Sequence, residues 1–254
     1  MVFWKKPIVR QYFHKGLLWR SNVLQETASY ELFFDLFYVG IIAITGDVAA
    51  EHPTGHSLLQ FAITFIMSWK FWSDVSVAVS WFEEDSIIRR LSVLFTLVCL
   101  LGLTTNMAES WEHTYIPLVS FYIAGRWFNA LYLLFMAWVL PMVRGAMIGY
   151  AVMAFIPGLF WIGSCHVEEP NRQALIWIAL FFDLFGSIIL IITRTADKWF
   201  PSRITRWFSA KVETFPGVNI EHQTERTGAF VTLIIGYSVI ALLYQSTDKI
   251  GINA

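Results

Sequence analysis

Nine ionisable residues lie within or beside long apolar segments, and their chemistry would suit the movement of protons or ions. They are Glu31, Asp35, Lys70, Asp74, Arg126, Asp183, His222, Glu225 and Arg226. A carboxyl group that loses contact with water acquires a higher pKa, which suits it to carry protons. A charge inside a membrane span costs roughly 2.5–3.5 kcal/mol on insertion scales, so each such residue needs a partner or water. The nine residues are therefore candidates either for a pathway or for ion pairs that hold helices together.

Four of these candidates should lie near the middle of their spans, at about one depth. Lys70 and Asp74 are four residues apart, so they share a helical face and can pair within one helix. Arg126 then needs an acid from another span. Asp183 is the expected partner because its depth matches best, and Asp74 is the next candidate.

The other five candidates should meet near the cytoplasmic ends of two spans. Glu31 and Asp35 share a face of the first span, and Glu225 and Arg226 begin the last one. Arg226 can offer a bidentate fork to the two acids. His222, one turn earlier, would add a group that titrates near neutral pH. The alternative is that Arg226 reaches a lipid phosphate and Glu31 reaches water.

Enzymatic and metal-dependent chemistry find little support in the sequence. No nucleophile-elbow, Walker or glycine-rich dinucleotide motif is present, so we expect neither an enzyme nor a cofactor. The HxxER pattern at 222–226 has too few ligands for a zinc site. Cys99 and Cys165 form no metal-ligand spacing, and nothing requires a disulfide between them.

Composition places the chain in a membrane. Its 254 residues are 56% hydrophobic and only 15% charged, whereas soluble domains are about 45–50% apolar and about 25% charged. The net charge of −1 gives no reason to expect a nucleic-acid partner. The expected partners are the lipid bilayer and, for a transporter, protons, ions or a small solute.

The apolar runs predict one all-α transmembrane domain over residues 1–254, a helix bundle of about seven spans. Each run is close to the roughly 20 residues that a helix needs to cross the hydrocarbon. The expected spans are 30–50, 58–82, 91–107, 116–140, 142–165, 174–194 and 227–246. Lipid offers no hydrogen-bond partners, so the spans of such a bundle must be helices, whose backbone groups hydrogen-bond to one another.

The basic residues predict the orientation. With the N-terminus in the cytoplasm, fourteen of the 18 Lys and Arg residues fall on the cytoplasmic side and two on the other. The segment 1–20 has no apolar core of its own, so it is not a cleavable signal peptide. Nothing in the sequence indicates which membrane the protein occupies.

Two amphipathic helices are expected on the cytoplasmic membrane surface, one in the segment 1–29 and one in the loop 195–226. Their apolar faces would be formed by Val9, Tyr12, Phe13 and Leu17, and by Ile204, Trp207, Phe208 and Val212. We interpret both as anchors.

The pentapeptide FFDLF occurs at residues 33–37 and again at 181–185. The copies lie five spans apart, so they would cross the membrane in opposite directions. Coincidence in a chain rich in Phe and Leu is one explanation, and an inverted repeat of the kind found in secondary transporters is the other. A five-plus-five repeat needs ten spans, so this chain would be part of something longer.

Three stretches resemble the low-temperature-requirement A (LtrA) family, especially its fungal members. They are QETASYELFFDLFYVGIIA at 25–43, SWKFWSDVSVAVSWFEEDSIIRRLSVL at 68–94, and HQTERTGAFVTLIIGYSVI at 222–240. The resemblance implies a polytopic membrane protein, in a family whose molecular function is not established. The family's Glu-Arg pair falls on Glu225 and Arg226, and its first-span acids fall on Glu31 and Asp35. Many bacterial members carry an acid soon after the glycine of the last stretch, where this chain has Gly236 followed by Tyr237.

The leading functional hypothesis is a transporter- or channel-like protein that moves protons or a small solute. The alternative is a membrane scaffold or stress-response protein that transports nothing, in which the charges only hold helices together. A water-accessible cavity that reaches the depth of the central charges from one side would favour transport. A dry bundle with every charge paired would favour the alternative.

Overall fold

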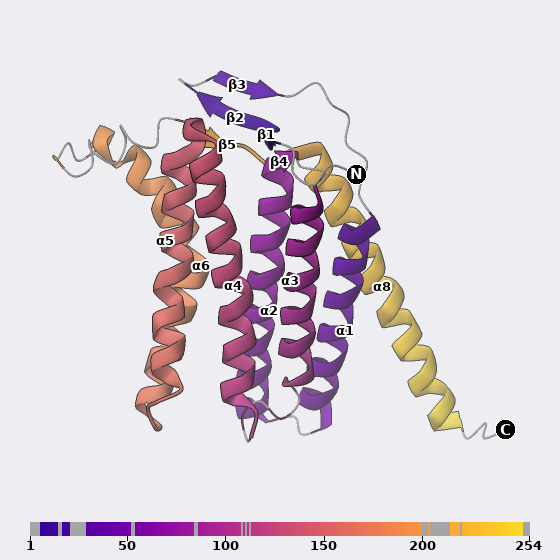
Figure 1. The fold of residues 1–254 in the computed structure, drawn as a ribbon. Helices are drawn as coiled ribbons and strands as arrows, with labels where there is room; N and C mark the ends of the chain where they lie inside the picture. Colours follow the sequence, from indigo (N-terminus) through magenta and orange to yellow (C-terminus); the bar gives the residue numbers. More distant parts are fainter. Residues whose placement is uncertain are drawn as a thin grey trace.

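The computed structural model describes residues 6–14, 17–20, 29–51, 54–83, 86–107, 109, 111, 113–199, 203, 214–218 and 220–250. Seven long helices lie in this part of the chain, as the sequence predicts, and they form a bundle in which consecutive helices run in alternating directions (Figure 1). They are α1 (Ser29–Glu51), α2 (Gly55–Trp81), α3 (Ile87–Thr105), α4 (Tyr115–Val139), α5 (Arg144–Ser164), α6 (Asn171–Trp199) and α8 (Ile220–Ile250). The all-α bundle is thus confirmed.

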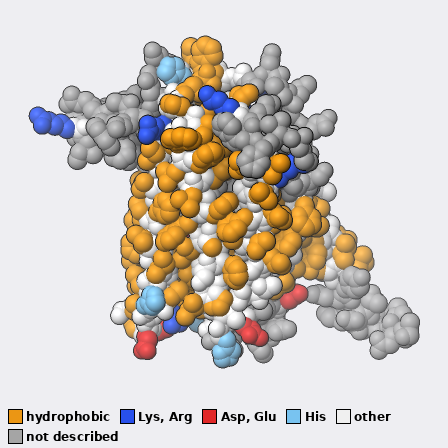
Figure 2. Space-filling model, viewed as in Figure 1, with side chains coloured by type: hydrophobic (Ala, Val, Ile, Leu, Met, Phe, Trp, Pro, Cys, Tyr) orange, Lys and Arg blue, Asp and Glu red, His pale blue; other side chains and the backbone are white. Residues whose placement is uncertain are grey.

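Five helical segments are long and apolar enough to cross a membrane, judged by length and composition. They are Ile87–Thr105, Tyr115–Val139, Pro141–Ser164, Asn171–Ile192 and Gln223–Leu243. On the face shown in Figure 2, hydrophobic side chains cover the middle of the bundle and charged side chains gather toward its two ends. The count of seven spans stays a prediction, because α1 and α2 are not among these five.

Polar side chains and a proline fix where several helices begin. The Thr54 hydroxyl accepts a hydrogen bond from the Ser57 backbone N–H at 3.1 Å and caps α2. Ser86 caps α3 in the same way through the Arg89 N–H at 3.2 Å. The break between α4 and α5 is a short 3₁₀ turn over Pro141–Val143, where the fixed backbone angle of the proline suits the first turn of the next helix.

The prediction of an amphipathic helix in the N-terminal segment is wrong. That segment forms strands β1 (Ile8–Val9), β2 (Gln11–His14) and β3 (Leu17–Arg20). β2 lies between β3 and β5 (Thr214–Pro216), and β1 pairs with β4 (Phe82–Glu83), all antiparallel. The segment is rich in β-branched and aromatic residues, and its backbone partners come from remote parts of the chain. A helical period read from one segment could not reveal those partners.

The strands lie across one end of the helix bundle, which we call the strand end (Figure 1). The Arg10 backbone N–H donates to the Trp81 carbonyl at 3.0 Å, so the strands join the last turn of α2. The Gly217 N–H donates to the Gln11 carbonyl at 2.7 Å. α1, α3, α5 and α8 start at the strand end, and α2, α4 and α6 return to it.

Two further boundaries differ from expectation. α6 continues to Trp199 and α8 begins at Ile220, several residues before the expected start at 227. No proline or glycine interrupts the polar turn that precedes the last apolar run, so the helix extends through it. The second expected surface helix, at 204–212, lies outside the described residues.

Aromatic packing attaches α8 to the rest of the bundle. The Phe230 ring stacks on Trp72 of α2 at 4.8 Å between centroids, and it lies 5.5 Å from Tyr38 of α1. All three side chains are buried in the larger of two hydrophobic clusters. Beyond this contact α8 diverges from the other helices (Figure 1). Its first turns are therefore the part that the bundle holds in place.

Candidate functional site

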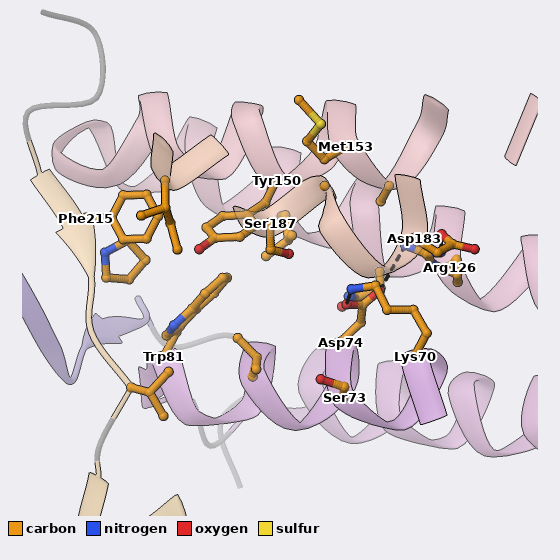
Figure 3. A pocket seen from close by; sticks show the side chains of 18 of the residues that line it. Lys70, Ser73, Asp74, Trp81, Arg126, Tyr150, Met153, Asp183, Ser187 and Phe215 are labelled. Atoms are coloured by element: carbon orange, nitrogen blue, oxygen red, sulfur yellow. Dashed lines mark hydrogen bonds and ion pairs between the residues drawn. The ribbon is translucent and has the colours of Figure 1, made fainter. Parts of the chain in front are cut away.

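Four charged side chains from three helices meet inside the bundle. Arg126 of α4 pairs through Nη1 with Asp183 of α6, and through Nη2 with Asp74 of α2 at 3.1 Å. Lys70, one turn before Asp74, pairs with the same carboxylate. We call this group the central charge cluster, and it consists of Lys70, Asp74, Arg126 and Asp183 (Figure 3). Arg126 therefore lies beside both of the acids that the sequence nominates.

The inner side of the cluster is densely hydrogen-bonded, although Arg126 Nε has no hydrogen-bond partner among the described residues. Asp183 has no exposed side-chain surface, and it also accepts hydrogen bonds from Tyr122 Oη at 2.8 Å and Trp161 Nε1 at 2.9 Å. Arg126 donates to Tyr122 Oη at 3.0 Å and lies over that ring. The three donors to Asp183 occupy both oxygens of its carboxylate. Asp183 is therefore an anchor for Arg126.

The outer side of the cluster is accessible. The side chain of Asp74 is 21% exposed and that of Lys70 is 13% exposed, whereas that of Arg126 is only 4% exposed. Asp74 is shared between two cations, so its carboxylate links α2 to α4. Of the two acids in the cluster, Asp74 is the one that solvent can reach.

A cavity of about 510 Å³ extends from the central charge cluster toward the strand end. This volume lies within the roughly 300–1,000 Å³ typical of small-molecule sites. Polar side chains line its middle and aromatic rings line the part near the strands (Figure 3). The polar side chains include Ser73, Asn129 and Ser187, and the aromatic rings near the strands include Phe13, Trp81, Tyr150 and Phe215.

The strands cover the outer end of this cavity. Phe13 of β2 and Phe215 of β5 both line it, together with Gly217 just after β5. A Cβ added at Gly217 would lie 3.2 Å from Gln11 Cγ and 3.2 Å from Phe13 Cε2, so glycine permits the close approach of the two segments. Sequence analysis missed these residues, because positions 13 and 215 become neighbours only through strand pairing.

A second buried ion pair joins α1 to α8. Arg226 donates to Asp35 through Nη2 at 2.9 Å and through Nε at 3.3 Å, a bidentate contact with one of the two acids that the sequence nominates. Trp72 Nε1 also donates to Asp35 at 2.7 Å, and the Arg226 guanidinium lies over the Trp72 ring. Asp35 is fully buried and Arg226 is 2% exposed.

Of the three remaining candidates, the structure describes the side chain of Glu225, which is exposed beside Arg226. The side chains of Glu31 and His222 lie outside the described residues. Within the described residues, the expected meeting of the first and last spans is seen as the pair of Asp35 with Arg226, to which α2 contributes Trp72.

The two FFDLF copies place their aspartates in matching environments. Asp35 and Asp183 are each buried, each accepts from an indole N–H, and each pairs with an arginine of another helix. α1 and α6 run in opposite directions, as an inverted repeat would require (Figure 1). The recurrence in sequence thus corresponds to a recurrence of local chemistry.

Within the described ranges, no three His, Cys, Asp or Glu side chains come together as ligands of a metal ion would. Cys99 and Cys165 are both free thiols, the first buried and the second partly exposed.

Comparison with known proteins identifies a family. The family model described as bacterial low temperature requirement A protein (LtrA) matches residues 27–253. No curated protein and no solved structure matches the chain.

Proposed function

The chain belongs to the LtrA family and is an integral membrane protein, and from this premise we propose that it moves protons or a small solute through its helix bundle. The observation that carries the proposal is the cavity that begins under the strands and ends on the central charge cluster. Ionisable groups that line a water-filled cavity inside a membrane protein mark ion and substrate pathways. A bundle whose charges served only to hold helices together would not need such a cavity.

Asp74 is the group that would take up a proton in this proposal. Both acids line the cavity, but the Asp74 side chain is 21% exposed, whereas the Asp183 side chain has no exposed surface and is held by Arg126, Tyr122 and Trp161. Protonation would remove the charge that holds both Lys70 and Arg126, and Arg126 would keep its pair with Asp183. α2 would then lose its ionic link to α4. The cluster thereby offers two arrangements that differ by one proton, which is what coupling between a proton and a helix movement requires.

We place the mouth of the cavity on the cytoplasmic side. The basic residues at the strand end include Arg10, Arg89, Arg90 and Arg144, and the opposite end of the described bundle carries Arg172. Positive residues are retained on the cytoplasmic side of membrane proteins. The bound species would therefore enter from the cytoplasm and meet the aromatic side chains before the charges.

The second candidate function is a membrane scaffold or stress-response protein that transports nothing. Its supporting observation is the saturation of Asp35 and Asp183, each of which has an arginine and at least one neutral donor. Such pairs can fix helix positions without any movement. This alternative gives no role to the partly exposed Asp74 or to the cavity beside it.

The test is proton and solute flux in liposomes that contain the purified full chain, with a pH-sensitive dye inside. We expect a pH gradient to dissipate faster than in empty liposomes and Asp74→Asn to return the rate to the background. Glu168→Gln is the matched control, because Glu168 is an exposed acid in the loop between α5 and α6. Equal rates for wild type and Asp74→Asn would refute the role of Asp74. Equal rates for wild type and empty liposomes, with every tested gradient, would favour the scaffold.

A further inference from the structure

The large cavity combines a charged inner end with largely apolar walls. The central charge cluster forms the inner end, and the rings of Trp81, Tyr150 and Phe215 lie toward the strands (Figure 3). The lining also includes the apolar side chains of Val77, Leu133, Met153 and Phe182. A ligand that fills this cavity should therefore have one charged or polar end and an apolar body.

The charges of the cluster balance while both of its acids are ionised, because two cations face two carboxylates. Uptake of a proton by Asp74 leaves the cluster with one net positive charge. A net charge inside the bundle is costly, so the protonated cluster favours a ligand that carries a single negative charge. A dianion would leave a negative charge in excess, and a cation would add to the positive one.

Asp74 occupies the position that the carboxylate of a ligand would take. Its two oxygens pair with Lys70 Nζ and with Arg126 Nη2, the second at 3.1 Å. Once Asp74 is neutral, both cations lose this partner, and a carboxylate from the cavity can replace it with the same geometry. Arg126 Nε, which has no hydrogen-bond partner among the described residues, is a further donor in the cluster.

We propose that the cavity binds a small monocarboxylate with an apolar body, together with one proton on Asp74. The inference rests on the proposed function, because it names the solute that the same cavity would carry. The carboxylate of the ligand pairs with Lys70 and Arg126, and its body lies among the apolar and aromatic side chains toward the strand end. A weak acid that enters in its neutral form supplies the proton itself: its O–H bond breaks, and the proton passes to the Asp74 carboxylate. The loaded cavity then holds the same net charge as the empty one.

This binding should strengthen as the pH falls, because the anion and the proton enter together. The other titratable groups that line the cavity are Lys70 on the same helix, Arg126 on α4, Asp183 on α6 and Tyr150 on α5. Among the described residues, α1, α3 and α8 contribute nothing to this lining. At any pH where Asp74 is ionised in the unliganded protein, each further pH unit should weaken binding about tenfold, because one proton is taken up with each anion.

The test is isothermal titration calorimetry of the purified full chain in detergent, with benzoate as the probe. Measurements at several pH values, and in buffers of different ionisation enthalpy, give the affinity and the number of protons taken up. Benzyl alcohol, protonated benzylamine and phthalate are the matched probes, because they keep the ring and change the charge. We expect benzoate to bind with proton uptake and the other three to bind at least about tenfold more weakly. Preference for benzylamine would overturn the proposal in favour of an organic cation.

Asp74→Asn separates this proposal from proton movement. The variant is neutral at position 74, so it should bind benzoate without proton uptake and with one affinity over the whole pH range in which benzoate is ionised. The control Glu168→Gln, at an exposed acid, should keep the wild-type pH dependence. If Asp74→Asn does not fold, the wild-type proton count still decides.

Two results would overturn the inference and leave the proposed proton movement standing. One is a chain that dissipates a pH gradient in liposomes and binds no benzoate at any pH. The other is a wild-type affinity for benzoate that does not change with pH. Proton-linked binding of benzoate without any flux in liposomes would instead support the ligand class and refute transport.

Discussion

Removing either partner of the Asp35–Arg226 pair should destabilise the protein more than any exposed charge does. Asp35→Asn keeps an acceptor for Trp72, whose N–H lies 2.7 Å from Oδ1, and leaves the Arg226 guanidinium buried without an anion. Breaking a buried ion pair in this way costs about 3–5 kcal/mol. Whole domains are stable by only about 5–15 kcal/mol. Arg226→Gln should fall in the same range, because Asp35 then keeps only the indole donor.

The charge exchange provides the sharper test. Asp35→Arg and Arg226→Asp alone each place two like charges in a buried site, so both should fail to accumulate as folded protein. The double exchange restores opposite charges and should recover part of the stability. Recovery stays partial because Trp72 Nε1 then faces a guanidinium and loses its acceptor, which costs about 1–3 kcal/mol.

The measurements are size-exclusion chromatography in detergent, for folded yield, and the tryptophan-monitored unfolding midpoint. Glu225→Gln is the matched control, since Glu225 is the exposed neighbour of Arg226 and its loss should cost no more than about 0.5 kcal/mol. The reasoning fails if Asp35→Asn and Arg226→Gln behave like this control. It also fails if the double exchange is no more stable than the worse of the two reversals.

Two further predictions follow from the fold. Arg90 and Glu109 lie at opposite ends of α3 and are both exposed. If each is replaced by Cys in a background without the native cysteines, an impermeant maleimide added outside intact cells should label only Glu109→Cys. Labelling of both variants would contradict the orientation. Gly125→Ala should destabilise the bundle by about 1–3 kcal/mol, because its Cβ would collide with the Phe71 ring. Gly236→Ala, which has open space around it, should leave the unfolding midpoint unchanged or raise it.

The helices and the ion pairs could be predicted because both depend on position along the chain. Apolar length defines each helix, and the place of a charge within its run defines depth. Arg126 and Asp183 lie near the middle of their runs, so matching depth was enough to bring them together. The same reasoning paired Asp35 with Arg226, since both stand in the first turns of helices that start at the strand end.

The strands and the cavity could not be predicted because they depend on direction across the bundle. Tyr12 lies opposite Pro216, and Val9 lies opposite Phe82. No local pattern marks such distant partners. Depth also does not reveal which way a side chain faces, so nothing in the sequence shows that the Asp74 side chain is partly exposed while that of Asp183 is fully buried.

The FFDLF recurrence shows how one local pattern can serve two purposes. In both copies the first Phe and the Leu are exposed on the surface of the bundle, as at Phe33 and Phe181. The Asp between them is buried inside the bundle. In both copies the pentapeptide therefore places a buried acid on a helix whose outer face is apolar. The two copies differ in the surroundings of the arginine with which the Asp pairs. Arg226 pairs with Asp35, whereas Arg126 pairs with Asp183 through Nη1 and with the more exposed Asp74 through Nη2. In the proposed function, this partly exposed acid beside an anchored pair is the group that would bind and release the proton.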